Sequence, residues 1–161
     1  MNVEDILKIL ERDAHATPEQ IAAMTGRNAA DVSNAIAEAE QQQVIRRYKA
    51  VVDWDRVDEE RVLAFIDVGV SPERGTGFDD IARRIYRYPE VVSVYLVSGQ
   101  QDLRVVVEGR SMKEVAFFVA EKLATIDQVR TTETHFLLKK YKEDGEIFDE
   151  QAADRRLAVA P

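Results

Sequence analysis

The 161-residue chain contains no cysteine and little histidine, tryptophan or proline. The lack of cysteine excludes a disulfide framework, a thiolate metal site and a cysteine nucleophile, and it suits a reducing compartment, so we expect a cytoplasmic protein. We expect no signal peptide, because the first residues are amphipathic and charged, and no segment has the length of a membrane span. A hydrophobic content of 45% beside 32% charged residues favours a folded globule over disorder.

Signatures of catalysis are also missing. The sequence has no Gly-rich phosphate loop, no paired-histidine metal spacing and no defensible Ser-His-Asp arrangement. Its two histidines, His15 and His135, stand far apart in the chain. We therefore predict that the protein is not an enzyme and that it has no metal site and no cofactor.

The net charge of −8 is unfavourable for a protein that binds nucleic acid, but the charge is unevenly distributed. Residues 1–44 carry a net charge of −5 and residues 143–161 a net charge of −4, whereas the part between them is close to neutral. Arg46, Arg47 and Lys49 form the only basic cluster close to the N-terminal part. We read the acidic C-terminal stretch as a surface-packed extension with a frayed end.

The first residues have the pattern of short amphipathic helices. Apolar side chains at i, i+3, i+4 and i+7 predict a helix over about residues 3–13. A second helix is predicted to start at about residue 18. Thr17 is suited to the N-cap, Pro18 to the first helical position, and Gln20 completes a capping box with Thr17. Gly26 is suited to the left-handed residue that ends this helix.

Asn28 is placed to cap a third helix that runs to about Gln42. Two helices joined by a short glycine turn, after a supporting helix, form a helix-turn-helix pattern, which we assign to residues 1–47 as a winged-helix-like, DNA-binding-like domain. An ordinary three-helix bundle without a DNA-binding role is the alternative interpretation.

Residues 44–54 are rich in β-formers and alternate in polarity, which predicts one or two extended strands. Residues 55–60 are acidic and unpatterned, so we place a strand linker at residues 48–60. Such a strand would tie the N-terminal domain to the next domain or to a partner subunit.

The second half of the chain predicts a strand–helix–strand–strand–helix–strand order over residues 61–142, typical of the ferredoxin-like fold, so the fold class is α+β. The expected elements are a strand at 61–70, a helix at about 77–88, a hairpin at 91–109, a helix from about 111 to 124 and a strand at about 129–141. Large apolar residues occur at both odd and even positions of the strands and therefore on both faces of the sheet. The sheet face not covered by helices therefore needs another cover, and association of subunits is the simplest one.

The ordered set of these elements resembles the leucine-responsive/AsnC family of feast-or-famine transcriptional regulators over roughly residues 3–142. The segments that carry the resemblance are VIRRYKAVVDW, YPEVVSVYLVSGQQDLRVVVEG and TTETHFLLKKYK. The hairpin of that family is typically Gly-x-x-Asp, which here runs from Gly99 to Asp102. An aromatic residue usually precedes the aspartate, whereas this chain has Gln101, so the pocket is more polar and the ligand is not identified.

The resemblance implies dimers formed through the sheets, which in the family often assemble into octamers, with an amino acid bound between dimers beside the hairpin and a Thr-x-Thr strand. Carboxylate and hydroxyl oxygens suit an α-ammonium group, and the N–H groups of a glycine turn suit an α-carboxylate. In an alternative without a ligand, the aspartate caps the turn and the threonines stabilise a strand edge. The ligand-binding residues implied are Ser98, Gly99, Gln100, Gln101, Asp102, Thr132 and Thr134.

The third helix departs from the family, because it contains no Lys or Arg. Asn34 suits adenine in the major groove and Ser33 suits a phosphate, but phosphate neutralisation supplies much of DNA affinity. In the alternative interpretation, the nearby arginines are solvated surface charges. The DNA-binding residues that we predict are Arg27, Asn28, Ser33, Asn34, Arg46, Arg47 and Lys49.

Three hypotheses follow from the sequence. The first is a DNA-binding regulator that responds to a small molecule, most simply an amino acid. The second is a ligand-binding oligomer whose degenerate helix-turn-helix binds a protein. The third is an enzyme, because siroheme decarboxylases resemble the same architecture.

Overall fold

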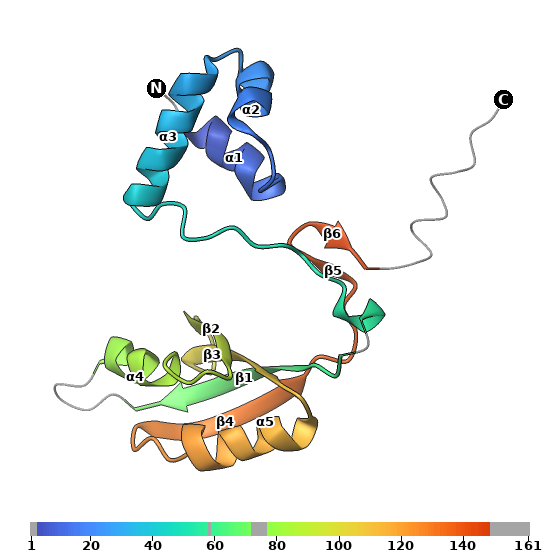
Figure 1. Ribbon diagram of the computed structural model, residues 1–161. Coiled ribbons are helices and arrows are strands. Elements are labelled where there is room, and N and C mark those ends of the chain that lie inside the picture. The colour runs from blue at the N-terminus through green and yellow to red at the C-terminus, as the bar shows by residue number, and fades with distance from the viewer. Residues whose placement is uncertain (1–2, 58, 72–76, 149–161) are drawn as a thin grey trace. The chain divides into compact units, whose positions relative to one another are not determined.

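The computed structural model describes residues 3–57, 59–71 and 77–148. The chain divides into two compact units, Met1–Val52 and Asp53–Pro161 (Figure 1). The first unit contains the three predicted helices, and the second contains a sheet with its helices. Each unit has a hydrophobic core of its own.

The N-terminal unit is built from α1 (Glu4–Arg12), α2 (Pro18–Thr25) and α3 (Ala29–Gln41). Among its described residues there is no strand, so the unit has three helices and no wing. Apolar residues from all three helices meet in one core, because each helix carries an apolar stripe at helical spacing. The buried members of this core are Ile6, Leu10, Ala16, Ile21, Ala22 and Val32.

The start of α2 confirms the predicted capping box. The Thr17 N–H donates to Gln20 Oε1 at 2.8 Å, and the Gln20 N–H donates to Thr17 Oγ1 at 3.3 Å. Gly26 takes the left-handed conformation with φ +67° and ends the helix. Asn28 Oδ1 accepts the N–H of Ala30 at 2.7 Å and caps α3. These local signals therefore fix the turn between α2 and α3 as the sequence predicts.

The strand predicted over residues 44–54 is wrong. No strand forms between α3 and η1 (Trp54–Arg56), a short 3-10 helix. A strand needs a neighbour that accepts and donates its backbone hydrogen bonds, and none of the described strands pairs with this segment. Alternating polarity was therefore not sufficient to predict a strand here.

The C-terminal unit contains a four-stranded antiparallel sheet with the order β2-β3-β1-β4. The two central strands are β3 and β1, and helices occupy the two crossovers, which confirms the predicted ferredoxin-like order. The elements are β1 (Val62–Val70), α4 (Phe78–Ile85), β2 (Val91–Leu96), β3 (Leu103–Gly109), α5 (Met112–Phe118), η2 (Val119–Leu123) and β4 (Val129–Phe136).

Some boundaries differ from the prediction. The helix that starts at Met112 widens into the π-helical turn η2 after Phe118. The last sheet strand ends at Phe136 rather than at residue 141. The chain then forms a two-stranded hairpin of β5 (Lys142–Glu143) and β6 (Glu146–Ile147). The rest of the predicted acidic extension, 149–161, lies outside the described residues, as do residues 72–76 of the loop before α4.

One sheet face packs on the helices and the other is open. Residues of β1 alternate between the two, so that Ala64, Ile66 and Val68 are fully buried against α4 and α5. Phe65 and Asp67 lie on the opposite face, which also carries the exposed ring of Tyr95. The open face thus has the large apolar groups that the sequence predicts.

Candidate functional site

The turn at residues 98–102 is fastened to the end of β1 by Asp102. The Asp102 N–H donates to the carbonyl oxygen of Val68 at 3.1 Å. Its carboxylate accepts the N–H of Val70 at 2.9 Å, at the point where the register between β1 and β4 shifts. The Asp102 carbonyl accepts the N–H of Val97 at 2.9 Å. Asp102 therefore holds the turn between two strands, which is the capping role that the sequence left open.

The turn itself presents backbone donors. Gly99 has φ +141°, a conformation that side-chain-bearing residues rarely adopt, and its exposure leaves the backbone accessible. Within the described part of the chain, none of the N–H groups of Ser98, Gly99, Gln100 and Gln101 donates a hydrogen bond. Backbone N–H groups without an acceptor at an exposed glycine turn are suited to an anion.

Gln101 points along the open face of the sheet toward Thr131. The Thr131 hydroxyl donates to Gln101 Oε1 at 3.1 Å. Both side chains cross over Gly69, where an added Cβ would lie 2.6 Å from Gln101 Oε1 and even closer to Thr131 Oγ1. The absence of a side chain at residue 69 therefore allows this amide–hydroxyl pair to form.

Thr132 and Thr134, the predicted ligand-binding threonines, lie on the other face of β4. They pair in register with Val68 and Ile66, whose side chains belong to the buried core. Thr131 pairs with Gly69 on the open face. Because successive side chains of a strand alternate, the structure brings Thr131 rather than the Thr-x-Thr pair beside Gln101. The sequence shows three threonines here, but only the register shows which one meets the turn.

An ion-pair cluster occupies the open face next to this turn. Arg104 donates to Asp67 through Nε at 2.7 Å and through Nη2 at 2.8 Å. His135 Nε2 lies 3.7 Å from Asp67 Oδ2 and 3.7 Å from Glu133 Oε1. The hydrogen bonds from Arg104 lower the pKa of the Asp67 carboxyl, partial burial opposes this, and the charges of Arg104 and His135 assist it. Asp67 thus stays ionised to a lower pH than usual.

The exposed side chains of α3 are neutral or acidic: Ser33, Asn34 and Ala37 are exposed, and so are the carboxylates of Asp31, Glu38 and Glu40. Ser33 and Asn34 are exposed there, as predicted for residues that face DNA. Asn28 is also exposed, but its side-chain oxygen is engaged as the cap of α3. Two of the predicted contact residues are therefore presented by the helix, and a third has a structural role as well.

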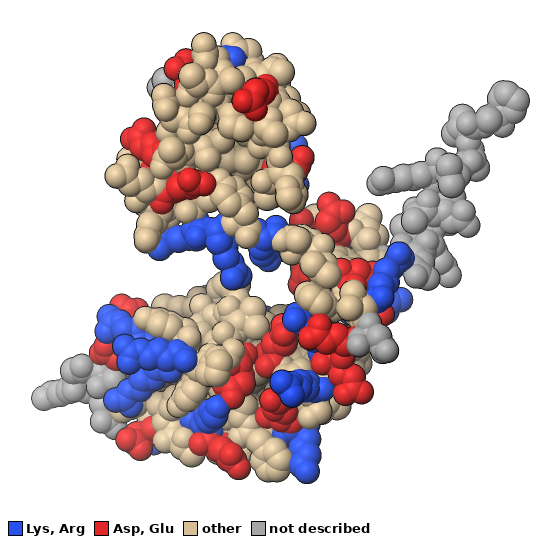
Figure 2. Space-filling view, viewed as in Figure 1, with Lys and Arg blue, Asp and Glu red and all other residues tan. Residues whose placement is uncertain are grey.

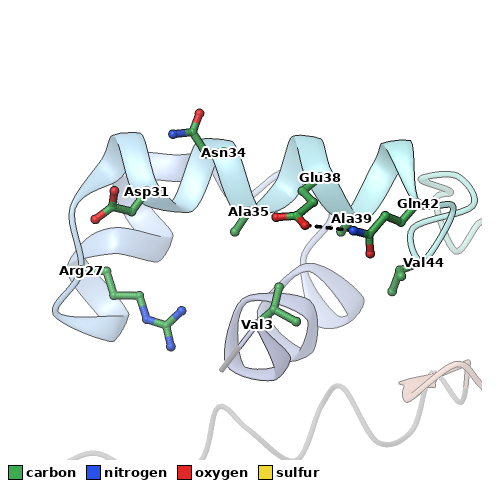
Figure 3. Close-up of a pocket in the computed structure, with 9 residues that line it drawn as sticks. All are labelled: Val3, Arg27, Asp31, Asn34, Ala35, Glu38, Ala39, Gln42 and Val44. Atoms are coloured by element: carbon green, nitrogen blue, oxygen red, sulfur yellow. Dashed lines mark hydrogen bonds between the residues drawn. The ribbon is translucent and has the colours of Figure 1, made fainter. Parts of the chain in front are cut away.

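Arg27 differs from the prediction, because its side chain points into the N-terminal unit. Its Nη2 lies 3.6 Å from Asp5 Oδ2, and its side chain is only 21% exposed. In Figure 3 Arg27 lies in a pocket of about 390 Å³ beside α1 and α3, whereas Asn34 points away from α1. The pocket is lined by Val3, Arg27, Asp31, Asn34, Ala35, Glu38, Ala39, Gln42 and Val44.

The segment after α3 presents a basic surface. Arg46, Arg47 and Lys49 are all exposed, and Figure 2 shows Lys and Arg atoms gathered where α3 runs into this segment. Arg46 Nη1 donates to Gln43 Oε1 at 2.8 Å. The Tyr48 hydroxyl donates to Glu40 Oε1 at 2.9 Å, joining the segment to α3. Partial burial and then the Glu40 hydrogen bond raise the pKa of the Tyr48 phenol.

Two negative findings concern the residues described. In the part of the chain that the structure covers, no cluster of three or more His, Asp or Glu side chains is placed to hold a metal ion. None of the described helices is long and apolar enough to cross a membrane.

Comparison with known sequences gives a family and a relative. The profile of the family described as "Lrp/AsnC ligand binding domain" matches residues 63–147. The chain is 50% identical over 158 residues to an uncharacterized HTH-type transcriptional regulator, YugG, of Bacillus subtilis, an alignment that covers 98% of this chain and 95% of the relative. The match includes the helix-turn-helix unit as well as the sheet.

Solved structures share the fold. A transcriptional regulator from Neisseria meningitidis in complex with L-Met has a TM-score of 0.70 at 22% identity, covering 86% of this chain and 89% of its own. The leucine response regulatory protein of Mycobacterium tuberculosis has a TM-score of 0.73 at 22% identity, covering 92% of this chain and 99% of its own. At these identities the similarity establishes the architecture.

Proposed function

The chain belongs to the Lrp/AsnC family of transcriptional regulators, and we propose that an amino acid bound at residues 98–102 controls its assembly or its DNA affinity. Membership of this family confirms the expectation of a regulator rather than an enzyme. The structure of the Neisseria meningitidis regulator contains L-Met, which supports an amino acid as the effector here.

The observation that carries the proposal is the set of four backbone N–H groups, those of residues 98–101, without an acceptor in the described chain. An α-carboxylate offers two oxygens to such donors, and hydrogen bonds to an ionised acceptor are stronger than those between neutral groups. Gly99 allows the turn that exposes these donors. The turn therefore forms the carboxylate end of the proposed site.

The ammonium end is formed by oxygen acceptors near the turn. Asp102 contributes its charge, and Gln101 and Thr131 contribute side-chain oxygens on the open sheet face. An amide oxygen and a hydroxyl oxygen each have two lone pairs, so their mutual hydrogen bond leaves acceptor capacity for an ammonium group. In this proposal Thr131 replaces Thr132 and Thr134, whose side chains face the helices in the same subunit.

Association of subunits through the open sheet face completes the proposal. Phe65 and Tyr95 on this face are apolar surface that a second copy would remove from water. Paired helix-turn-helix units then bind DNA together, so that a modest affinity of each unit is multiplied. A ligand at the edge of the association face would shift assembly and thereby DNA binding.

The test is binding of the full chain to its own upstream DNA at low and at physiological salt, with and without a mixture of the twenty amino acids. We expect binding that weakens with salt and shifts with the mixture, and fractionation of the mixture then identifies the ligand. Sedimentation in the same buffers reports assembly. Absence of DNA binding by a correctly assembled oligomer would contradict the proposal and favour a protein partner for the acidic third helix.

Replacing Gly69 with alanine tests the site without changing the sequence of the turn. The new methyl group displaces Gln101 and Thr131, so we expect the effector response to be lost. Both displaced atoms end side chains on an exposed face, and overpacking of this kind costs about 1–3 kcal/mol at most. Isothermal titration with the identified amino acid and urea unfolding measure the two effects. An unchanged ligand affinity in the folded variant would exclude the Gln101–Thr131 pair from the site.

A further inference from the structure

A group of arginines lies on α4 and in the turn that follows it, far in sequence from the helix-turn-helix unit. Arg83, Arg84 and Arg87, together with Asp80, surround a hollow of about 360 Å³ on the surface of the C-terminal unit. Figure 2 shows Lys and Arg atoms gathered over α4. All three arginines are exposed. The hollow is therefore a positively charged surface open to solvent.

The fold fixes these side chains on the outside. Ile81 and Ile85 of α4 are fully buried in the core of the unit, so residues 83 and 84 must face away from the sheet. Arg83 Nη1 donates to Asp80 Oδ1 at 2.5 Å. Arg84 and Arg87 form no ion pair or hydrogen bond with other described residues. Two guanidinium groups thus remain available for an anion.

We propose that the arginine hollow at the end of α4, formed by Arg83, Arg84 and Arg87 with Asp80, binds phosphates of the DNA backbone. The inference rests on the proposed function, since it assumes that the protein binds DNA. The third helix carries no Lys or Arg and residues 1–44 have a net charge of −5, so Arg46, Arg47 and Lys49 are the nearest cations to α3 and further phosphate contacts have to come from the C-terminal unit. Guanidinium groups bind phosphate oxygens through two parallel hydrogen bonds and do not lose their charge.

The charged lining of the hollow favours a long polyanion over a small ligand. Small-molecule sites are mainly lined by apolar side chains with a few polar groups that orient the ligand. This hollow is lined by charged side chains alone. An exposed group of cations suits the repeated charges of a duplex, where each neutralised phosphate releases counterions.

The double substitution Arg84→Ala/Arg87→Ala in the full chain tests this proposal. We expect the slope of log K against log salt to fall by about 0.9 for each phosphate that the variant no longer neutralises, and DNA affinity at 0.1 M salt to fall on the order of tenfold or more. The control is Arg110→Ala/Arg130→Ala, which removes two exposed charges from the same unit outside α4. Arg84→Lys/Arg87→Lys is expected to keep most of the slope and lose part of the affinity.

The outcomes separate this inference from the proposed function. If the wild type binds DNA and the Arg84→Ala/Arg87→Ala variant shows the same salt slope, this inference is wrong and the proposed function stands. If the Arg110→Ala/Arg130→Ala control loses as much DNA affinity as this variant, the effect is one of net charge, and the inference is wrong as well. If the wild type binds ATP, and the Arg84→Ala/Arg87→Ala variant loses ATP binding but keeps its DNA binding, the hollow binds a free phosphate compound. This result also overturns the inference. No DNA binding by the wild type contradicts the proposed function itself.

Discussion

Substitution of Asp102 by alanine is expected to abolish the effector response and to destabilise the hairpin. The carboxylate accepts the N–H of Val70, a buried residue at the register shift of β1. Without this acceptor the N–H is left unsatisfied, which costs about 1–3 kcal/mol. The turn also loses the anchor that positions its four exposed donors. Urea unfolding and titration with the identified amino acid measure the two losses.

The matched control is Asp102→Asn, which keeps an oxygen that accepts the Val70 N–H but removes the charge. We expect this variant to retain most of the stability of the wild type and to bind the amino acid less tightly, because an amide attracts the ammonium group less than a carboxylate does. If both variants bind the effector as the wild type does, the turn is not the ligand site, whatever their stabilities.

Substitution of Arg46 and Arg47 by alanine is expected to weaken DNA binding about equally for all sequences. These exposed arginines follow α3, whose own exposed side chains are neutral or acidic. Bonds to phosphates carry no sequence information, so their removal lowers specific and non-specific affinity together. If the variant neutralises two phosphates fewer, the slope of log K against log salt should fall by about 1.8 and the DNA affinity at 0.1 M salt by roughly 60-fold at most.

Fluorescence anisotropy with the upstream DNA and with a scrambled duplex of equal length measures this effect at four or more salt concentrations. The control is Lys8→Ala/Arg12→Ala, which removes the same charge from α1 of the same unit. We expect the control to keep the wild-type slope. A weakening confined to the upstream DNA would instead assign base contacts to Arg46 and Arg47, and unchanged binding would place the DNA surface elsewhere.

Elements with strong local signals were predicted closely. The capping box at Thr17 and the left-handed Gly26 each involve residues within one helical turn, so short sequence motifs contain the whole interaction. The order of strands and helices in the C-terminal unit followed from periodicity in the same way. Local hydrogen bonds and amphipathic stripes depend little on distant parts of the chain.

Interactions between distant segments were not predictable. Gln101, Thr131 and Gly69 lie on three different strands or turns, and only the register of β1 with β4 brings them together. Arg27 was predicted as a DNA contact from its place in the turn before α3, yet its Nη2 lies 3.6 Å from Asp5 Oδ2 on α1. The segment 44–54 has the composition of a strand but lacks a neighbour to pair with.

The sequence by itself determined the family, the order of the elements and the location of the turn at residues 98–102. These depend on local capping, on alternation and on a glycine conformation that neighbouring residues define. Only the tertiary structure decided which threonine meets the turn, what Asp102 holds and where the arginines of α4 gather. Such pairings depend on strand register and on which face of a helix is buried. Both are determined by packing of the entire hydrophobic core and not by any local segment.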